Sequence, residues 1–475
     1  MEKFYLTTSI AYTNAPPHIG FALESIQADV LARWQRKLEK DVFFLTGTDE
    51  HGTKIAKKAE DLGKDPQEFV DEISGKFKDL TKALNISNDD FIRTTDRKRH
   101  WPVVERFWKK MAENGDIYKK KYSGSYCSGC EAFLSERDLE DGKCLVHKKE
   151  PEIIEEENYF FKLSKYQKQL KEIIEKDEYQ IVPEGRKNEI LSFINQGLED
   201  ISFSRSVEKL KWGIPVPGDE TQVMYVWADA LSNYISALGG EDSKYWPADV
   251  HCIGKDILKF HALIWPAMLL SLEIPLPKRL FVHGFITVDG QKMSKSIGNV
   301  IDPFELVNKY GADAVRYYLL RELSSSGDGD FTYDKFEERY NSDLASGVGN
   351  LLARVKTMAE KVSFKPGLIK DIEPEIKKTQ EGYKKALEEF KFNEALKSIW
   401  DLIGFCDRYI DKEKPWEHKD NSSRVIDNLL IALDNISELL EPFLPETAEK
   451  IKQEIKRKSN KFSNPKSENL FPRLT

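Results

Sequence analysis

The chain contains few cysteines and no long hydrophobic run. Five cysteines among 475 residues are sparse and odd in number, which excludes a disulfide framework. The longest apolar stretch, Ala262–Leu270, is far shorter than the ~20 residues that a membrane-spanning helix requires. The first ten residues lack the apolar core of a secretion signal. We therefore expect a cytoplasmic protein that does not enter a membrane.

The chain also lacks an excess of positive charge. Its 72 Lys and Arg residues against 80 Asp and Glu residues give a net charge of −8, which argues against a broad cationic surface for nucleic acid. The acidic excess lies entirely in residues 1–330, with 46 basic and 54 acidic residues, whereas residues 331–475 hold 26 of each. An average over a chain of several domains is therefore weak evidence, and the net charge leaves the kind of partner open.

The sequence has no Walker loop, no GxGxxG motif and no internal repeat. Instead, short apolar runs alternate with stretches of helical spacing, in the order Phe4–Tyr12, Ile19–Lys40 and Val42–Leu45. This alternation predicts βαβ units around a parallel sheet. The sheet is expected to resume at Val223–Trp227, His251–Gly254 and Leu280–Ile286.

Two segments depart from this alternation. Residues 116–225 are rich in aromatic residues and contain three of the cysteines, so we predict an inserted module there. From about residue 333 the pattern is helical and amphipathic, which predicts an antiparallel bundle. The predicted helices of the bundle are Ser342–Lys361, Ile376–Phe390, Asn393–Lys412, Ser422–Leu440 and Pro445–Arg457.

Two short motifs suit the binding of phosphate. His18 and Gly20 lie where the first strand gives way to a helix, whose N-terminal N–H groups attract phosphate oxygens. The segment Lys292-Met-Ser-Lys-Ser296 places two lysines in a loop that suits a polyphosphate, because a lysine ammonium can follow a departing pyrophosphate. Taken alone, the first motif fits an ordinary loop histidine equally well.

Three cysteines and a histidine have the spacing of a metal site. They form the pattern Cys127-x₂-Cys130-x₁₃-Cys144-x₂-His147, in which two close ligand pairs suit tetrahedral Zn²⁺. A closed Cys₃His set leaves no position for water and predicts a structural ion; the alternative is reduced cysteines without metal. Cys252 and Cys406 lie in apolar segments and are expected to be buried.

The His18-Ile-Gly20 element and the KMSKS element about 270 residues later resemble the signature pair of the class I aminoacyl-tRNA synthetases. Within that class the chain resembles the methionyl-tRNA synthetase family, and the resemblance covers essentially the whole chain. The segments that carry it are Phe44–Gly52, Tyr225–Ala230, Ile253–Ile257 with Phe260-His261, Phe331–Lys335 and Leu470–Arg473. It implies ATP-dependent activation of L-methionine to methionyl-adenylate with release of pyrophosphate, and transfer to the 3'-terminal adenosine of tRNA(Met). Mg²⁺ is expected to accompany ATP.

The resemblance also implies a fold. The fold class is α/β, with a Rossmann-type parallel-sheet catalytic domain, an inserted connective module that carries a zinc knuckle, and an all-α anticodon-binding helical bundle. The predicted domains are residues 1–115 and 226–332 for the two catalytic halves, 116–225 for the insertion and 333–475 for the bundle. The insertion is too short for the large editing domain of the isoleucyl, valyl and leucyl relatives. The chain also lacks the extra C-terminal tRNA-binding and dimerisation domain of some relatives, so a monomer is expected.

Residues of this chain that match the family's functional positions follow from the same resemblance. The catalytic set is His18, Lys292 and Lys295. The ATP-binding set is His18, Gly20, Glu24, Gly254, Asp256, Lys292 and Lys295. The methionine-binding set is Ile10, Tyr12, Trp227, Ala230, Tyr234 and His261, with Asp49 pairing the substrate ammonium. The anticodon-binding set is Asn350, Arg354 and Trp416, and the zinc ligands are Cys127, Cys130, Cys144 and His147. Taken alone, the aromatic members of these sets would fit core packing.

The chain departs from the family's pattern at position 21, where Phe21 replaces the second histidine of the HIGH element. We expect His18, Lys295 and the helix N-terminus to suffice, with some loss in adenylation rate. Alternatives are a cysteinyl-tRNA synthetase, a nucleotidyltransferase with HxGH chemistry and a non-catalytic RNA-binding paralogue. The grouped zinc ligands argue against the first, the helical domain against the second, and Lys292, Lys295 and Asp49 against the third.

Overall fold

The computed structural model describes residues 1–127, 129, 132–134, 136–146, 148–293, 298–359, 371–417, 419–458 and 469–474. The chain forms two compact units, each assembled from segments that are separate in sequence. Unit 1 comprises Met1–Pro17, Leu38–Thr81 and Ser87–Val282; unit 2 comprises His18–Lys37, Lys82–Ile86 and His283–Thr475. In the described part of the chain, no helix has the length and apolar content needed to cross a bilayer.

A parallel sheet forms the centre of unit 1. Its strand order is β10-β16-β15-β1-β3-β2, with β4 beside β3. The strands are β1 (Lys3–Thr8), β2 (Ala11–Tyr12), β3 (Asp41–Asp49), β4 (Asp90–Arg93), β10 (Gln180–Val182), β15 (Val250–Gly254) and β16 (Arg279–His283). β1 pairs in parallel with both β3 and β15. Because its residues from Phe4 to Thr8 are buried, β1 is a central strand, as its run of aromatic and β-branched residues predicts.

Amphipathic helices bury their apolar faces in unit 1. In α3 (Pro66–Ala83), for example, Phe69, Val70, Ile73 and Phe77 recur at helical spacing and are all buried. The other helices of unit 1 are α2 (Thr53–Asp61), α4 (Trp101–Glu113), α5 (Gln167–Glu175), α6 (Glu184–Asn195), α7 (Val226–Ala230), α8 (Asn233–Ser236) and α9 (Trp265–Leu272). A π-helical turn, Phe260–Ile264, precedes α9.

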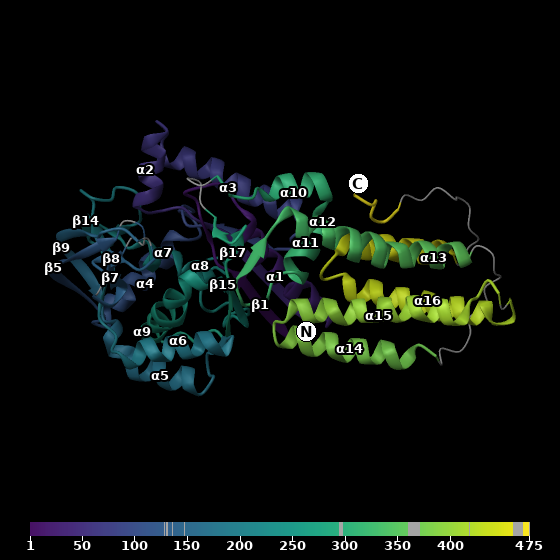
Figure 1. The fold of residues 1–475 in the computed structure, drawn as a ribbon. Helices are drawn as coiled ribbons and strands as arrows, with labels where there is room; N and C mark the ends of the chain where they lie inside the picture. The colour runs from purple at the N-terminus through teal and green to yellow at the C-terminus, as the bar shows by residue number, and fades with distance from the viewer. Residues whose placement is uncertain are drawn as a thin grey trace. The chain divides into compact units, whose positions relative to one another are not determined.

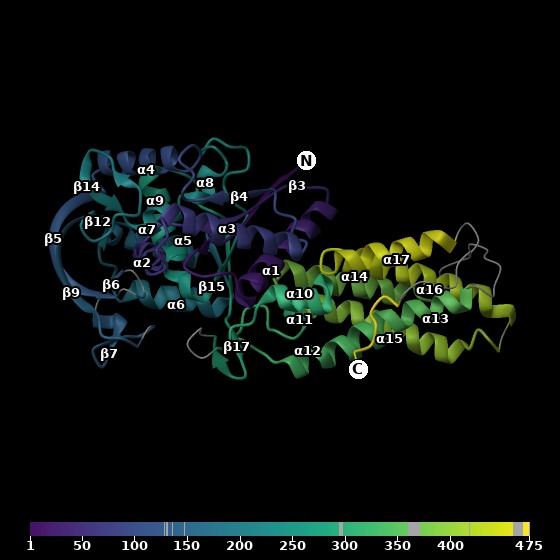
Figure 2. The same ribbon diagram turned by 90° about the horizontal axis from the view of Figure 1, so that it is seen from above.

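Antiparallel strands dominate the segment predicted as an insertion. β5 (Ile117–Cys127) and β9 (Glu152–Phe161) form a long curved ribbon, visible in Figure 2, with β6 (Ala132–Leu134) and β11 (Ile201–Ser202) at its sides. A second sheet has the order β12-β14-β13, from Ser204–Ser206, Asp219–Met224 and Pro215–Val216. β7 (Leu139–Glu140) pairs with β8 (Lys143–Cys144).

Two findings refine the predicted course of the sheet. The expectation that the parallel sheet resumes at Val223–Trp227 is wrong, because β14 pairs antiparallel with β12 and β13. The last residues of β14 are hydrogen-bonded on this side, for example from the Met224 N–H to the Ile214 carbonyl. Because β14 lies between β12 and β13, it cannot also pair with a strand of the central sheet. Conversely, β10 lies within residues 116–225 but pairs in parallel with β16. The predicted domain boundaries stay predictions.

Unit 2 begins with the long helix α1 (Ile19–Lys37), which is buried along most of its length. Its Asp29 accepts from Arg33 at 2.8 Å and pairs with the fully buried Arg316 at 2.7 Å. Unit 2 also contains α10 (Pro303–Tyr310), α11 (Ala312–Arg321) and a small sheet of β17 (Ile286–Val288), β18 (Gln291–Lys292) and β19 (Gly329–Phe331).

The C-terminal helices of unit 2 lie side by side, as Figures 1 and 2 show in green and yellow. They are α12 (Tyr333–Arg339), a π-helical stretch Tyr340–Gly349, α13 (Asn350–Ala359), α14 (Glu373–Glu388), α15 (Phe392–Glu413), α16 (Lys419–Leu440) and α17 (Pro445–Lys458). Their apolar faces form the core of the bundle; in α15, for instance, Leu396, Ile399 and Ile403 are buried. The predicted fold class, an α/β catalytic part followed by an all-α bundle, is confirmed.

Candidate active site and anticodon interface

Three neighbouring strands of unit 1 direct residues of the predicted methionine and ATP sets to one edge of the sheet. Ile10 follows the end of β1, Asp49 ends β3, and Gly254 ends β15. These strands are adjacent and parallel, so their carboxyl ends meet at the same edge. Ligands of open parallel sheets bind outside the carboxyl ends of the strands.

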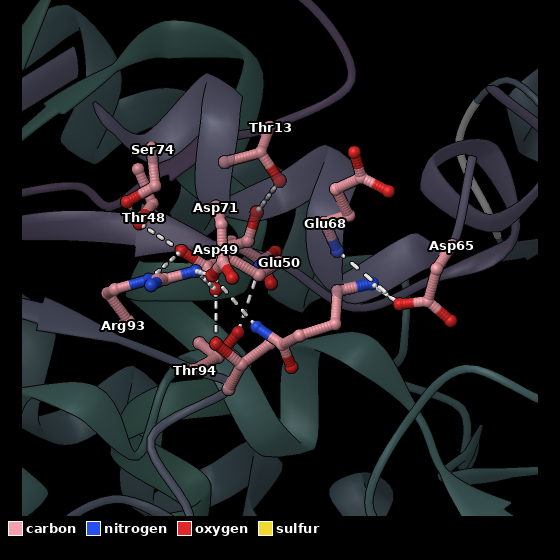
Figure 3. A network of polar contacts seen from close by, with 12 residues as sticks. Thr13, Thr48, Asp49, Glu50, Asp65, Glu68, Asp71, Ser74, Arg93 and Thr94 are labelled. Carbon is pink, nitrogen blue, oxygen red and sulfur yellow. Dashed lines mark hydrogen bonds and ion pairs between the residues drawn. The ribbon is translucent and has the colours of Figure 1, made fainter. Parts of the chain in front are cut away.

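Asp49 lies in a tightly bonded segment (Figure 3). It is 6% exposed, and its carbonyl accepts from the Thr13 N–H at 3.0 Å and from the Thr13 hydroxyl at 3.1 Å. These bonds keep Asp49 opposite Tyr12 in the β2–β3 pairing. The structure therefore brings together two members of the predicted methionine set.

The residue after Asp49 anchors the segment. Glu50 is fully buried, and its carboxylate accepts two hydrogen bonds from Arg93, at 2.7 and 2.9 Å, and one from the Thr48 hydroxyl at 2.7 Å. The Glu50 N–H donates to the Thr94 hydroxyl at 2.9 Å (Figure 3). A paired, hydrogen-bonded buried charge of this kind fixes the backbone beside it, which holds Asp49 in place.

Two aromatic members of the predicted methionine set, Tyr234 and Trp227, both contact a third member, His261. The Tyr234 hydroxyl lies 2.7 Å from His261 Nε2, and the Trp227 ring meets the His261 ring edge-on at 6.1 Å. Trp227 also stacks on Phe260, with ring centroids 3.9 Å apart. Ala230 is buried in the same helix as Trp227, α7, and its carbonyl accepts from Asn233. Polarisable aromatic surfaces of this kind suit a thioether side chain.

His261 is neutral in this environment. Burial lowers the pKa of His261 to about 4, although its hydrogen bond to the Ile257 carbonyl acts in the opposite direction. Its Nδ1 lies 3.0 Å from that carbonyl, so Nδ1 carries the proton and Nε2 accepts from the Tyr234 hydroxyl. The ring therefore adds no charge to the apolar wall.

Asp256 lies in the short turn that follows β15. The turn Lys255–Ile257 begins directly after Gly254, and its last residue supplies the carbonyl that orients His261. Asp256 is exposed and Gly254 is buried. Both predicted nucleotide contacts of unit 1 thus lie at the same sheet edge as Asp49.

In unit 2, His18 caps the N-terminus of α1. Its carbonyl accepts from the N–H groups of Phe21 and Ala22, and its Nδ1 accepts from the Gly20 N–H at 3.0 Å. With Nδ1 as the acceptor, a neutral His18 ring carries its proton on Nε2. A Cβ atom at Gly20 would lie 2.8 Å from His18 Cε1, so only glycine permits this ring position. His18 is exposed at the positive end of the helix dipole.

Glu24 lies one turn further along α1 and is buried. Its carboxylate lies 2.9 Å from His283 Nε2, while His283 Nδ1 faces the Gly284 carbonyl at 2.8 Å. Sequence reasoning missed His283, which no motif singles out. A nucleotide that contacts Glu24 would share this carboxylate with the His283 ring.

The lysine motif begins at the last residue of a hairpin of unit 2. β17 and β18 are joined by a turn with Asp289 and Gly290 at positive φ, and β18 ends at Lys292. Asp330 holds this turn, because its carboxylate accepts from Thr287 at 2.6 Å and from the Gly290 N–H at 2.8 Å. Lys295 lies outside the described residues.

Two of the four predicted zinc ligands are buried in one small cluster. Cys127 ends β5 and Cys144 ends β8; they are 4% and 1% exposed and pack with Leu134 and Leu139. Cysteines from two separate strands thus converge, as a knuckle requires. Cys130 and His147 lie outside the described residues. The buried positions predicted for Cys252 and Cys406 are confirmed.

The predicted anticodon residues lie on α13 and after α15. Asn350 is exposed at the start of α13, and Arg354 follows one turn later. The Arg354 guanidinium donates to Asp407 at 2.8 Å and to Asp411 at 2.6 Å, both on α15. Trp416 follows the end of α15 and is 55% exposed. Arg354 is thus attached to α15 rather than freely solvated.

Comparisons with known proteins match this arrangement. A family model described as "tRNA synthetases class I (M)" matches residues 4–144 and 134–356, and one described as "Anticodon-binding domain of tRNA ligase" matches residues 370–472. The methionine–tRNA ligases of Clostridium acetobutylicum and Brucella suis are 47% and 44% identical to the chain. The matches cover 96% and 95% of the chain, and 73% and 91% of the respective relative.

A solved structure gives the same answer. The Mycobacterium tuberculosis methionyl-tRNA synthetase in complex with methionyl-adenylate superposes with a TM-score of 0.91 at 38% identity, over the full length of both chains. The methionine–tRNA ligase of Thermotoga maritima is 44% identical over 94% of the chain and 74% of the relative. The chain therefore belongs to the methionine–tRNA ligases, a family of class I aminoacyl-tRNA synthetases.

Proposed function

We propose that the residue sets assigned above carry out the methionine–tRNA ligase reaction. In this reaction the methionine carboxylate attacks the α-phosphate of ATP, pyrophosphate leaves, and the methionyl group is then transferred to the 3'-terminal adenosine of tRNA(Met). One residue set binds methionine, a second binds the nucleoside, and a third stabilises the phosphate charge. Positioning and charge stabilisation dominate such phosphoryl chemistry, because little covalent help is needed. Mg²⁺ accompanies ATP and shields its phosphate charge.

In unit 1, Asp49 pairs the methionine ammonium, and Ile10, Tyr12, Trp227, Ala230, Tyr234 and His261 surround its side chain. The observation that carries this assignment is the neutral Tyr234–His261 pair beside the Trp227 ring. A neutral aromatic wall and a buried carboxylate within the same unit fit a zwitterionic amino acid with an apolar, sulfur-containing side chain. Gly254 and Asp256, at the same edge, contact the nucleoside.

In unit 2, His18 Nε2 donates to the phosphate oxygens as charge develops on the leaving pyrophosphate. Gly20 leaves room for the His18 ring, and Glu24 lies one turn further along α1. Lys292 and Lys295 supply positive charge to the polyphosphate. Phe21 has no polar group to add, so His18 acts without a second histidine.

The neutrality of His261 gives a test that needs no ATP. With a pKa of about 4 in the folded protein, His261 stays neutral from pH 8 down to about pH 5.5. We therefore expect the Kd for methionine, measured by tryptophan fluorescence, to change by less than about twofold over this range. A rise in Kd with a midpoint near pH 6.5 that His261→Gln abolishes would contradict the assignment.

We further propose that Cys127, Cys130, Cys144 and His147 hold one structural Zn²⁺. The burial of Cys127 and Cys144 in one cluster supports it, and bound Zn²⁺ would crosslink the turns that carry the ligands. We expect about one zinc ion per purified chain, and below about 0.2 in Cys144→Ser, by elemental analysis. Cys252→Ser, at a buried cysteine of unit 1 remote in sequence, is the matched control. Zinc-free wild-type protein with full activity would exclude the site.

Asn350, Arg354 and Trp416 are proposed to bind the anticodon of tRNA(Met). The exposed Trp416 ring can stack on an unpaired base, and the carboxylates of α15 orient Arg354. Loss of one stacking contact costs about 1–3 kcal/mol, so Trp416→Ala should raise the KM for tRNA about 5- to 150-fold in aminoacylation. Methionine-dependent pyrophosphate exchange needs no tRNA and reports on the fold of the same sample. An unchanged KM for tRNA would show that the anticodon binds elsewhere.

The monomeric state and the cytoplasmic location stay predictions. Light scattering on the eluting protein would test the first, because a dimer would double the expected mass of 54.8 kDa.

A further inference from the structure

The interior of unit 1 contains a carboxylate held between two histidines, outside every residue set assigned above. Asp229 is 1% exposed. One of its oxygens lies 2.6 Å from His51 Nδ1, and the other lies 2.6 Å from His100 Nε2. The Asp229 cluster, as we call Asp229, His51 and His100, is further bonded through His100 Nδ1 to the Ser236 hydroxyl at 2.7 Å.

The Asp229 cluster joins elements that carry methionine-binding residues. Asp229 lies in α7 between Trp227 and Ala230. His51 follows two residues after Asp49, beyond the end of β3. The bond between Asp229 and His51 is therefore a direct link between the helix that bears the aromatic wall and the strand end that bears the ammonium partner.

The remaining contacts keep both ends of this link in place. His51 packs edge-on against the Trp101 and Trp212 rings, at 5.9 and 5.5 Å. The Trp212 indole donates to the Glu50 carbonyl, and the Trp212 carbonyl accepts from the Gly52 N–H. The backbone on both sides of His51 is thus fixed, so a shift of Asp229 cannot be absorbed there.

Electrostatics favour the ionised carboxylate. Burial by itself raises the pKa of the Asp229 carboxyl, but the charges and hydrogen bonds of His51 and His100 outweigh burial and leave that pKa below its usual range. Each histidine donates to one carboxylate oxygen. An amide at position 229 would keep the shape but replace one of the two acceptor oxygens with a donor.

We propose that Asp229 is a positioning residue for methionine binding. By binding His51 and His100 at once, it sets the distance between α7, with Trp227 and Ala230, and Asp49. The inference rests on the methionine-binding set proposed above. It goes further by naming a residue that keeps the aromatic residues of α7 at a fixed distance from Asp49. Asp229 itself is not proposed to contact methionine.

If Asp229 served only to stabilise the fold, its replacement would have a different kinetic effect. Loss of core stability would change the amount of active enzyme, and so the apparent kcat, without changing the KM for one substrate. Loss of positioning at the aromatic wall would weaken methionine binding and leave ATP binding intact. A rise in the KM for methionine without a rise in the KM for ATP therefore indicates positioning, whereas unchanged KM values with a lower apparent kcat indicate a role in stability alone.

The test compares Asp229→Asn with Asp249→Asn in pyrophosphate exchange. Asp249 is a suitable control because it is also buried in unit 1 and accepts from the Tyr5 N–H at 2.8 Å and from Lys278 at 2.7 Å. It precedes β15 and so lies at the end of that strand opposite Gly254. We expect Asp229→Asn to raise the KM for methionine at least about tenfold and the KM for ATP less than about twofold. Asp249→Asn should change neither KM by more than about twofold, whatever its effect on Tm.

The proposal is overturned if Asp229→Asn raises both KM values together, or changes the KM for methionine no more than Asp249→Asn. If Asp229→Asn does not fold, His51→Gln and His100→Gln carry the test with the same criteria. Asp49→Asn in the same series distinguishes the two levels of the argument. If Asp49→Asn leaves the KM for methionine unchanged, the proposed methionine site is wrong. If Asp49→Asn raises this KM and Asp229→Asn leaves it unchanged, the site stands and only the positioning role of Asp229 is wrong.

Discussion

Replacing Asp49 by asparagine should reduce kcat/KM for methionine about 30- to 5,000-fold in pyrophosphate exchange. This range corresponds to about 2–5 kcal/mol, the usual cost of removing one partner of a buried charge pair. Asp49 is 6% exposed and is fixed by Thr13 and by the bonded Glu50 beside it, so water replaces it poorly as a partner for the ammonium. The loss should appear mainly as a higher KM for methionine.

Asp71→Asn is the matched control. Asp71 pairs with Arg93 at the exposed rim of the same network (Figure 3), where an ion pair contributes little. We expect a change of less than about fivefold in kcat/KM for methionine. Equal losses in the two variants would indicate damage to the Glu50–Arg93 network rather than loss of the ammonium partner.

The second large effect is expected at His18. His18→Asn should lower the kcat of pyrophosphate exchange about 100- to 1,000-fold, which is the usual cost of removing a donor that stabilises transition-state charge. Asparagine is a favoured N-cap residue, so α1 should still begin at Ile19 and Tm should change little. The KM for methionine should stay within about threefold, because methionine binds through unit 1.

Phe21→His completes this experiment. If His18 acts without a second histidine, restoring one at position 21 should raise the exchange rate several-fold in the wild-type background. An unchanged rate would show that Phe21 costs the enzyme nothing. A His18→Asn variant with an undiminished kcat would remove His18 from the catalytic set.

Local sequence pattern predicted the parts of the fold that depend on nearby residues. The apolar spacing from Ile19 placed the start of α1, and the alternation of strands and helices gave β1, β3, β15 and β16. The prediction that Val223–Trp227 joins the parallel sheet was wrong, because a run of strand-forming residues does not show which strand it pairs with. In the structure, β14 pairs within the antiparallel sheet. Trp227 and Tyr234 lie in two separate short helices, α7 and α8, and both contact His261.

Contacts between residues distant in sequence could not be predicted in this way. The segments around His51 and Asp229 were recognised as matching the family, but their pairing across 178 positions is a property of the folded chain. The same holds for Glu24 and His283, which are 259 positions apart. The neutral state of His261 likewise depends on burial, which is set by packing and not by the residues beside it.

The central claim is that this chain activates methionine. The most direct test is ATP–pyrophosphate exchange with each of the amino acids in turn, without tRNA. We predict strong exchange with methionine and only background with the others, cysteine included. Exchange that depends on cysteine, or that proceeds equally well without any amino acid, would contradict the account.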